Sequence, residues 1–158
     1  MEFRKAKETE IEAIAALYES VKGQKGCTWD EFYPSIDTAR EDFSCGGLYV
    51  LTEENSVIGA VSVVGENELD DENCWREKTN AREVARIAVA PSRQGQGLAA
   101  EMLKILFREL EMSGCRAVHL LVAKENPPAL RTYQKLGFDF LGDHFVYDND
   151  FFMCEKIL

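Results

Sequence analysis

One stretch of the chain decides the fold, and it reads Val84-Ala85-Arg86-Ile87-Ala88-Val89-Ala90-Pro91-Ser92-Arg93-Gln94-Gly95-Gln96-Gly97-Leu98-Ala99-Ala100. Residues 83–89 are rich in β-formers and predict a strand, which Pro91 ends. Two glycines follow, and apolar side chains then recur at helical spacing through residues 97–113. Glycines let backbone N–H groups approach an anion closely, and a helix N-terminus adds unpaired N–H groups and a partial positive charge. The stretch therefore predicts a strand, a loop and a helix that together hold a phosphate or pyrophosphate.

The segments on either side of this unit predict further strands and helices. Strands are expected at residues 2–6, 48–52, 57–64, 83–89, 117–123, 138–145 and 151–157. Helices are expected after Thr9, which with Glu12 forms a capping-box pattern, after Pro34-Ser35, over 97–113 and from Pro128 to Leu136. The order is β-α-α-β-β-β-α-β-α-β-β, which predicts an α/β protein in the broad sense, with a mixed sheet and helices on its faces. No repeat or linker interrupts the chain, so we expect one domain over residues 1–158.

The charge of the chain limits its partners. It has 158 residues with 18 Lys and Arg against 28 Asp and Glu, so the formal net charge is −10. Nucleic acid requires clustered Lys and Arg, and anionic membrane surfaces repel a polyanion, so we expect neither partner. The longest uncharged stretch, residues 55–65, is far shorter than the roughly 20 residues that span a bilayer. The first residues alternate charges where a secretory signal needs an apolar core. We expect a cytoplasmic protein that attracts cationic partners.

The thiol and imidazole side chains do not form a metal-binding pattern. The five cysteines are odd in number, widely spaced and without a C-x-x-C pair: Cys27, Cys45, Cys74, Cys115 and Cys154. This pattern argues against a disulfide framework and against structural zinc, and it favours reduced thiols in apolar sites. Neither His119 nor His144 stands at metal-ligand spacing from a carboxylate. We expect no bound metal, and we expect His119, within a strand, to be structural.

Two phosphate-binding patterns compete for the glycines. Gly95-x-Gly97-x-x-Ala100 fits the dinucleotide fingerprint G-x-G-x-x-A. That fingerprint should follow its strand directly and be followed by a carboxylate about 20 residues on. Here Pro91-Ser92-Arg93-Gln94 intervenes, and position 115 is a cysteine. A nicotinamide oxidoreductase is therefore disfavoured.

The second pattern, Q/R-x-x-G-x-G/A, is matched by Gln94-Gly95-Gln96-Gly97-Leu98-Ala99. It resembles the pyrophosphate loop of the GNAT superfamily of acyl-CoA N-acyltransferases, and Arg86-Ile87-Ala88-Val89-x-Pro91 resembles the strand before that loop. Farther along, the chain resembles the second signature of the superfamily with Asn126-Pro127-Pro128-Ala129-x-x-x-Tyr133-x-Lys135-Leu136-Gly137-Phe138. The resemblance covers residues 82–142 in detail. It implies an α/β (α+β) fold in which helices flank a mixed, splayed β-sheet.

The resemblance also implies where acetyl-CoA binds. Backbone amides of the loop would hold its pyrophosphate, and they map onto Gln94, Gly95, Gln96, Gly97, Leu98 and Ala99. The pantetheine arm would pair like an additional strand with the backbone of Ile87, Ala88 and Val89, so this strand should splay from residues 119–122. Asn126 would hydrogen-bond the pantetheine or fix its own loop. Arg93 and Lys135 would contact the phosphates through their charges.

The chemistry implied by the resemblance is acyl transfer from a thioester to an amine. Tyr133 matches the tyrosine that donates a proton to the leaving thiolate of CoA, and a backbone N–H near Val89 would polarise the thioester carbonyl. The superfamily often places a glutamate base where this chain has Ala85. Glu83 lies two residues earlier and projects from the same face of the strand, so it is our candidate base, directly or through one water. Residues 66–72 offer further carboxylates.

These inferences lead to one main function and one alternative. We expect an acetyl-CoA-dependent N-acetyltransferase acting on a primary amine of a small molecule or peptide, which the net charge suggests is cationic. The alternative is a non-catalytic acyl-CoA-binding or regulatory domain, which Ala85 mildly favours. Trp29, Tyr33 and Trp75 lie in variable segments and fit an acceptor-pocket wall and a hydrophobic plug equally well. The sequence is compatible with a monomer and with a homodimer.

Overall fold

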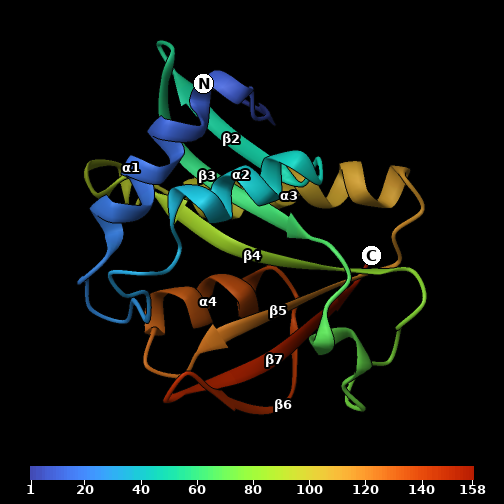
Figure 1. The fold of residues 1–158 in the computed structure, drawn as a ribbon. Coiled ribbons are helices and arrows are strands. Elements are labelled where there is room, and N and C mark those ends of the chain that lie inside the picture. The colour runs from blue at the N-terminus through green and yellow to red at the C-terminus, as the bar shows by residue number, and fades with distance from the viewer.

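The computed structural model describes residues 1–158 and arranges seven strands in one sheet with helices on both faces (Figure 1). The strands are β1 (Glu2–Lys5), β2 (Leu48–Glu53), β3 (Ser56–Val64), β4 (Ala81–Val89), β5 (Ala117–Ala123), β6 (Asp139–Val146) and β7 (Asn149–Ile157). The helices are α1 (Ile11–Val21), α2 (Ile36–Ser44), α3 (Leu98–Met112) and α4 (Pro127–Lys135). Short 3-10 helices cover Glu8–Glu10, Glu68–Asp71 and Pro91–Arg93. The order predicted from the sequence is confirmed, and no helix is long and apolar enough to cross a membrane.

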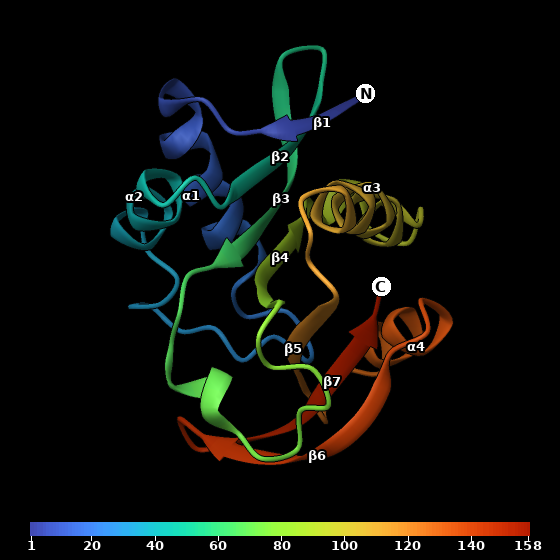
Figure 2. The same ribbon diagram turned by 90° about the vertical axis from the view of Figure 1, so that its right-hand side faces the viewer.

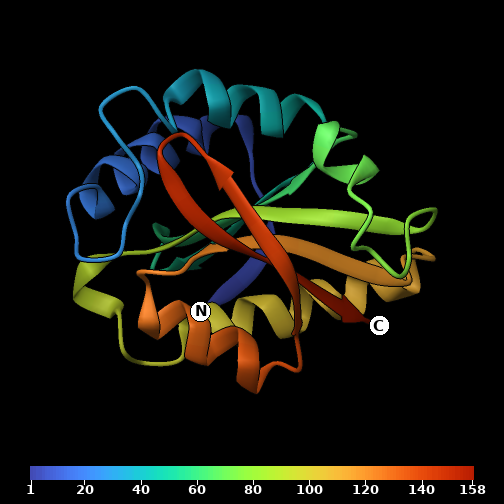
Figure 3. The same ribbon diagram turned by 90° about the horizontal axis from the view of Figure 1, so that it is seen from below.

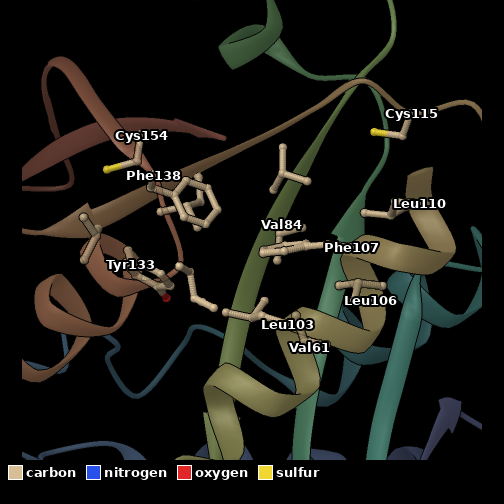
Figure 4. Packing of buried hydrophobic residues seen from close by; sticks show 14 of the residues in the cluster. Val61, Val84, Leu103, Leu106, Phe107, Leu110, Cys115, Tyr133, Phe138 and Cys154 are labelled. Atoms are coloured by element: carbon tan, nitrogen blue, oxygen red, sulfur yellow. The ribbon is translucent and has the colours of Figure 1, made fainter. Parts of the chain in front are cut away.

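The sheet separates two layers of helices. Its strand order is β1-β2-β3-β4-β5-β7-β6, and every neighbouring pair is antiparallel except β4 and β5. Helices α1 and α2 cover one face, and α3 and α4 cover the other (Figure 2). Ile14 and Tyr18 of α1 pack in the first layer, whereas Leu103 of α3 and Tyr133 of α4 pack in the second (Figure 4). Because both faces of β5 are covered, its sequence is almost entirely apolar.

Strands β4 and β5 pair only briefly before they separate. Their register ends at Glu83 opposite His119, after three residue pairs. Beyond that point β4 remains paired with β3, and β5 remains paired with β7, so the two parts of the sheet diverge (Figure 1). The splay predicted between residues 87–89 and residues 119–122 is confirmed. We call the point where the strands part the fork.

A β-bulge in β4 accompanies the fork. The register between β3 and β4 shifts at Arg86 and Ile87, which together stand opposite Val61. Arg86 has a φ of 51°, a left-handed conformation that is strained for a residue with a side chain. The additional residue bends and twists the strand. The bulge therefore turns the end of β4 away from β5.

A buried ion pair holds Arg86 at the bulge. Its Nε and Nη2 donate to the carboxylate of Asp42 on α2 at 2.7 and 2.6 Å, and Ser62 donates to the same carboxylate at 2.6 Å. Nη1 donates to the Tyr33 hydroxyl at 2.9 Å. Burial opposes the charge of Arg86, but its contacts with Asp42 and Tyr33 outweigh burial and raise the guanidinium pKa. The charge is thus retained inside the protein.

The beginning of α1 differs from the sequence prediction. Thr9 does not cap this helix, because the 3-10 turn over Glu8–Glu10 precedes it. Glu10 accepts a hydrogen bond from the Lys7 N–H at 2.8 Å and forms a salt bridge with Arg4 of β1 at 2.7 Å. An ion pair with a neighbouring strand therefore fixes the turn, and spacing along the chain does not reveal such a pair.

Replacing Asp42 by Asn should strongly destabilise the protein, because the Arg86 charge is then buried without its partner. Breaking a buried pair in this way costs about 3–5 kcal/mol of unfolding free energy. The control is Asp37→Asn on the same helix, whose salt bridge with Arg40 is exposed and should contribute less than about 1 kcal/mol. Urea unfolding measures both losses. Equal losses would show that Arg86 does not depend on Asp42.

Candidate active site

The fork opens into a cleft of about 450 Å³. One wall consists of β4, the following loop and the start of α3, and the opposite wall consists of β5 and α4. Most residues predicted to bind the co-substrate or to act in catalysis line this cleft together: Ile87, Ala88, Val89, Arg93, Gln94, Gly95, Gly97, Leu98, Ala99, Asn126 and Tyr133. Gln96, Lys135 and Glu83 do not line it.

The loop between β4 and α3 presents a row of free backbone donors. None of the six consecutive N–H groups from Gly95 to Ala100 donates a hydrogen bond within the protein, and the helix ladder starts with Glu101 donating to Gly97. Gly95 and Gly97 have φ angles of 75° and 78°, a left-handed conformation that favours glycine. Successive N–H groups at the positive end of a helix form a concave anion site. The loop therefore has the geometry of a pyrophosphate site.

The edge of β4 that faces β5 is unpaired beyond Glu83. Residues 84–89 of β4 and 120–123 of β5 line the cleft from its two sides. Because the backbone groups on this edge of β4 have no strand partner, an extended ligand with amide groups can pair with them. The Gln94 side chain donates to the Val89 carbonyl at 3.0 Å and ties the loop to the end of the strand.

Tyr133 reaches the cleft from α4. Asn126 caps this helix by accepting a hydrogen bond from the Ala129 N–H at 3.3 Å. The Tyr133 ring packs edge-on against Phe138 with 5.6 Å between ring centroids, and only 9% of Tyr133 is exposed (Figure 4). Burial raises the pKa of Tyr133 well above its ordinary value, with a smaller contribution from Cys154. The phenol is therefore protonated at neutral pH.

Glu83 lies outside this cleft. It lines a separate cavity of about 210 Å³ together with Glu66 and Asp70, which belong to the loop after β3. Asn67 of the same loop donates a hydrogen bond to the Glu83 carboxylate. Burial raises the pKa of Glu83 more than the contacts with Asn67 and Arg86 lower it. Glu83 therefore does not contact the cleft directly.

Of the two cations predicted to contact phosphate, Arg93 lines the cleft and Lys135 does not. Arg93 lines the cleft, but its guanidinium forms a salt bridge with Glu53 of β2 and donates to Gln96 at 3.2 Å. The hydrogen bond from Arg93 lowers the pKa of Glu53 despite the opposing effect of burial. Lys135 lies in the last turn of α4 and does not line the cleft. The charge of Arg93 is therefore already compensated within the protein.

From the segment between α1 and α2, sequence reasoning offered Trp29 and Tyr33 as either pocket wall or plug and missed the other lining residues. Residues 24–29 line the cleft, and Trp29 among them is a wall residue. Gly26 fits against the turn before α4, where an added Cβ would lie 3.0 Å from the Glu125 carbonyl oxygen. Gly26 also has a φ of 85°. Besides Trp29, this glycine is a local signal in the segment, which matches neither family motif.

Trp75 and His119 belong to a buried cluster behind the fork. Their rings stack with 3.9 Å between centroids, and His119 Nε2 lies 2.9 Å from the carboxylate of the fully buried Glu155. Glu155 also accepts hydrogen bonds from Arg76 Nε at 2.6 Å and from the N–H groups of Arg76 and Glu77. Burial opposes ionisation of Glu155, but these hydrogen bonds outweigh it and lower the Glu155 pKa. Trp75 is therefore a hydrophobic plug, and His119 makes a structural contact.

The cysteine and histidine side chains do not gather into a cluster. All five cysteines are free thiols, and Cys115 and Cys154 are buried. The structure contains no group of three or more His, Cys, Asp or Glu side chains that could hold a metal ion.

A forked sheet, a glycine loop before α3 and a tyrosine on α4 together form the arrangement expected of an acyl-CoA N-acyltransferase. The model of the acetyltransferase (GNAT) family matches residues 11–138, so the chain belongs to the GNAT acetyltransferase family. A spermine/spermidine N(1)-acetyltransferase of Bacillus subtilis (strain 168) is 41% identical over 51 residues, which are 32% of this chain and 34% of that protein. The match thus spans about a third of the length of this curated relative.

Solved structures share the fold over nearly the whole chain. A GNAT-family acetyltransferase from Streptococcus agalactiae 2603 superposes with a TM-score of 0.84 and 21% identity, covering 99% of this chain and 95% of that one. The structure of yncA from Salmonella typhimurium, which contains its cofactor acetyl-CoA, has a TM-score of 0.77 and 20% identity, covering 100% and 94%. At these identities the likeness shows the fold alone.

Replacing Ala99 by Glu should weaken CoA binding, because a carboxylate would then stand beside the free N–H groups. The affinity should fall at least about tenfold, equivalent to about 1.4 kcal/mol, while the fold survives because an acidic residue suits the first turn of a helix. Ala99 is preferable to Gly97, whose φ of 78° would strain any side chain. The neutral control is Ala99→Gln. Calorimetry with CoA compares the variants, and equal affinities would rule out the phosphate-loop assignment.

Proposed function

We propose that the protein is an N-acetyltransferase that moves an acetyl group from acetyl-CoA to a primary amine of a small molecule or peptide. The observation that carries this proposal is the single cleft lined by a row of free N–H groups, an unpaired strand edge and a buried tyrosine. Each of the three matches one chemical part of the co-substrate. The loop suits the pyrophosphate, the edge of β4 suits the amide groups of pantetheine, and Tyr133 suits the sulfur.

Acetyl-CoA binding is assigned to residues that line the cleft. Backbone amides of Gly95, Gln96, Gly97, Leu98 and Ala99 hold the pyrophosphate, although Gln96 is not among the residues that line the cleft. The N–H of Gln94, which was predicted to contribute as well, donates instead to the Pro91 carbonyl at 3.4 Å. The backbone of Ile87, Ala88 and Val89 pairs with the pantetheine arm. A free N–H near Val89 polarises the thioester carbonyl as the amine attacks. Asn126 fixes the turn before α4, which supports its assignment as a residue that shapes the cleft rather than reacts.

Tyr133 is proposed as the general acid. The amine attacks the thioester carbonyl, the bond from carbon to sulfur breaks, and the phenol delivers its proton to the departing sulfur. The raised pKa makes the Tyr133 phenol a weaker acid. Burial also raises the pKa of a thiol, so a buried thiolate is a stronger proton acceptor than a thiolate in water. Burial raises the pKa of the Cys154 thiol, in the same apolar cluster, to about 12. Proton transfer from Tyr133 therefore accompanies the departure of the sulfur in this environment.

Glu83 is proposed as the base that removes the amine proton through water. It is the only carboxylate in β4, and burial keeps its pKa above the ordinary value of 4.5. A raised pKa brings a carboxylate closer to the operating pH of a base. The position of Glu83 outside the cleft argues against direct transfer and is the reason for the intervening water.

The acceptor is proposed to be a cationic amine. The net charge of −10 supports this, as does the second cavity, where Glu66, Asp70 and Glu83 outnumber the single cation Arg82. The relative from Bacillus subtilis acts, by its name, on spermine and spermidine. No carboxylate lines the main cleft itself, so the attraction acts from outside the cleft.

The alternative is a non-catalytic acyl-CoA-binding domain, which Ala85 in the usual glutamate position favours. Turnover with a panel of polyamines, amino acids and peptides distinguishes the two functions when free CoA thiol is detected. Calorimetry with CoA runs in parallel. Binding together with turnover supports the enzyme, and binding without turnover on every amine supports the alternative.

Replacing Tyr133 by Phe removes only the hydroxyl and keeps the packing against Phe138. The value of kcat should fall by about 10²–10⁴, the usual contribution of a positioned acid, with little change in the KM for acetyl-CoA. Steady-state kinetics measure both quantities. If turnover stays within about threefold of the wild type, Tyr133 is a packing residue.

Replacing Glu83 by Gln removes the basic carboxylate and leaves a neutral side chain of similar size. Because a base acts only when deprotonated, and burial raises the Glu83 pKa, the wild-type rate should fall with decreasing pH from above 4.5. The variant should lose rate near neutral pH and regain part of it at high pH, where free amine is abundant. The pH dependence of kcat checks this expectation. An unchanged profile would assign the proton to ordered water or to another carboxylate of residues 66–72.

A further inference from the structure

The charged residues that line the cleft are all cations. They are Lys25, Arg86 and Arg93, and no Asp or Glu is among the 30 lining residues, although 28 of the 158 residues of the chain are acidic. Arg86 is paired with Asp42, and Arg93 is paired with Glu53. Lys25 has no salt bridge or side-chain hydrogen bond with any part of the protein. Its charge is therefore the one uncompensated charge in the wall of the cleft.

Lys25 is exposed, and the residues on either side of it contact opposite walls of the cleft. On one side of it, Gln24 accepts a hydrogen bond from the Gln94 side chain at 3.0 Å, at the beginning of the phosphate loop. On the other side, Gly26 packs tightly against the turn at Glu125 and Asn126, where an added Cβ would lie only 3.0–3.2 Å from the nearest atoms. Figure 3 shows this connection between α1 and α2 beside the ends of β4 and β5. We call residues 24–26 the bridge, because it touches both walls.

The bridge brings a full positive charge, that of Lys25, to the same cleft as donors that carry only partial charges. The N–H groups of residues 95–100 begin next to Gln94, to which the bridge is bonded. CoA carries several negative charges on its phosphates, and a protein of net charge −10 repels them over a distance of about one Debye length, roughly 8–10 Å. The N–H groups alone offer about half a unit of positive charge. A cation near them offsets this repulsion.

We propose that Lys25 forms a charge-assisted hydrogen bond with a phosphate of bound CoA and replaces Arg93 and Lys135 in that role. The proposal rests on the proposed function, since it assumes that acyl-CoA is the ligand of the cleft. Arg93 braces the loop against Glu53, and Lys135 lies outside the cleft. The same ammonium group can also pair with a carboxylate of the acceptor. The test therefore distinguishes a CoA phosphate from an acceptor carboxylate.

The test compares Lys25→Gln and Lys25→Arg with Lys104→Gln. Lys104 is exposed on α3 and outside the cleft, so its replacement changes the net charge equally without touching the site. CoA is titrated in the absence of acceptor by calorimetry at about 50 and 200 mM salt. Lys25→Gln should lower the affinity for CoA about three- to tenfold at low salt and reduce the dependence of that affinity on salt concentration. Lys25→Arg should retain affinity within about twofold, and Lys104→Gln should match the wild type.

The outcomes separate this proposal from the proposed function. Unchanged CoA affinity in Lys25→Gln, with wild-type protein that binds CoA, overturns the phosphate role of Lys25 and leaves the proposed function intact. If the variant then shows a raised KM for carboxylate-bearing acceptors alone, the anion is the acceptor carboxylate. Equal weakening by Lys104→Gln shows only a general effect of charge and also overturns the proposal. Wild-type protein that does not bind CoA overturns both.

Discussion

The site depends on the buried ion pair between Arg86 and Asp42. A left-handed residue at a bulge is strained by about 1–3 kcal/mol, and the two charge-assisted hydrogen bonds to Asp42 offset that strain. Asp42 is in turn fixed by Ser62, so α2, β3 and β4 meet at one carboxylate. Because the bulge diverts β4 from β5, this contact between two layers supports the opening that contains the glycine loop, the unpaired edge of β4 and Tyr133.

The cleft separates charges in a way that the overall composition conceals. Acidic residues outnumber basic ones in the chain, yet none of them lines the cleft, and Glu66, Asp70 and Glu83 line the second cavity together with Arg82. Two of the three cations in the walls are compensated by Asp42 and Glu53. The walls of the cleft therefore offer an anion backbone dipoles and one free charge, that of Lys25.

Local patterns in the sequence were sufficient to predict the order of strands and helices along the chain, the glycine loop, and the place of Tyr133 on a helix. The loop depends on residues adjacent in the chain, Gly95 and Gly97, and the position of Tyr133 follows from a helix whose cap, Asn126, starts the same motif. Contacts between distant segments were not predictable. Arg93 is diverted by Glu53, forty positions away, and the bridge reaches Glu125 across the cleft. Glu83 was placed on the correct strand, but the fold of residues 66–72 encloses it in another cavity.

The unpaired edge of β4 also bears on how the protein behaves in a crowded solution. A free strand edge normally offers a template on which another polypeptide can add, and proteins protect such edges against aggregation. Here the edge lies inside the fork and faces β5, and residues 24–29 after α1 line the same cleft. A strand from another chain would have to enter between β4 and β5 to reach this edge, unlike a strand that adds to β1 or β6 at the outside of the sheet. The position of the edge within the sheet therefore hinders strand addition there.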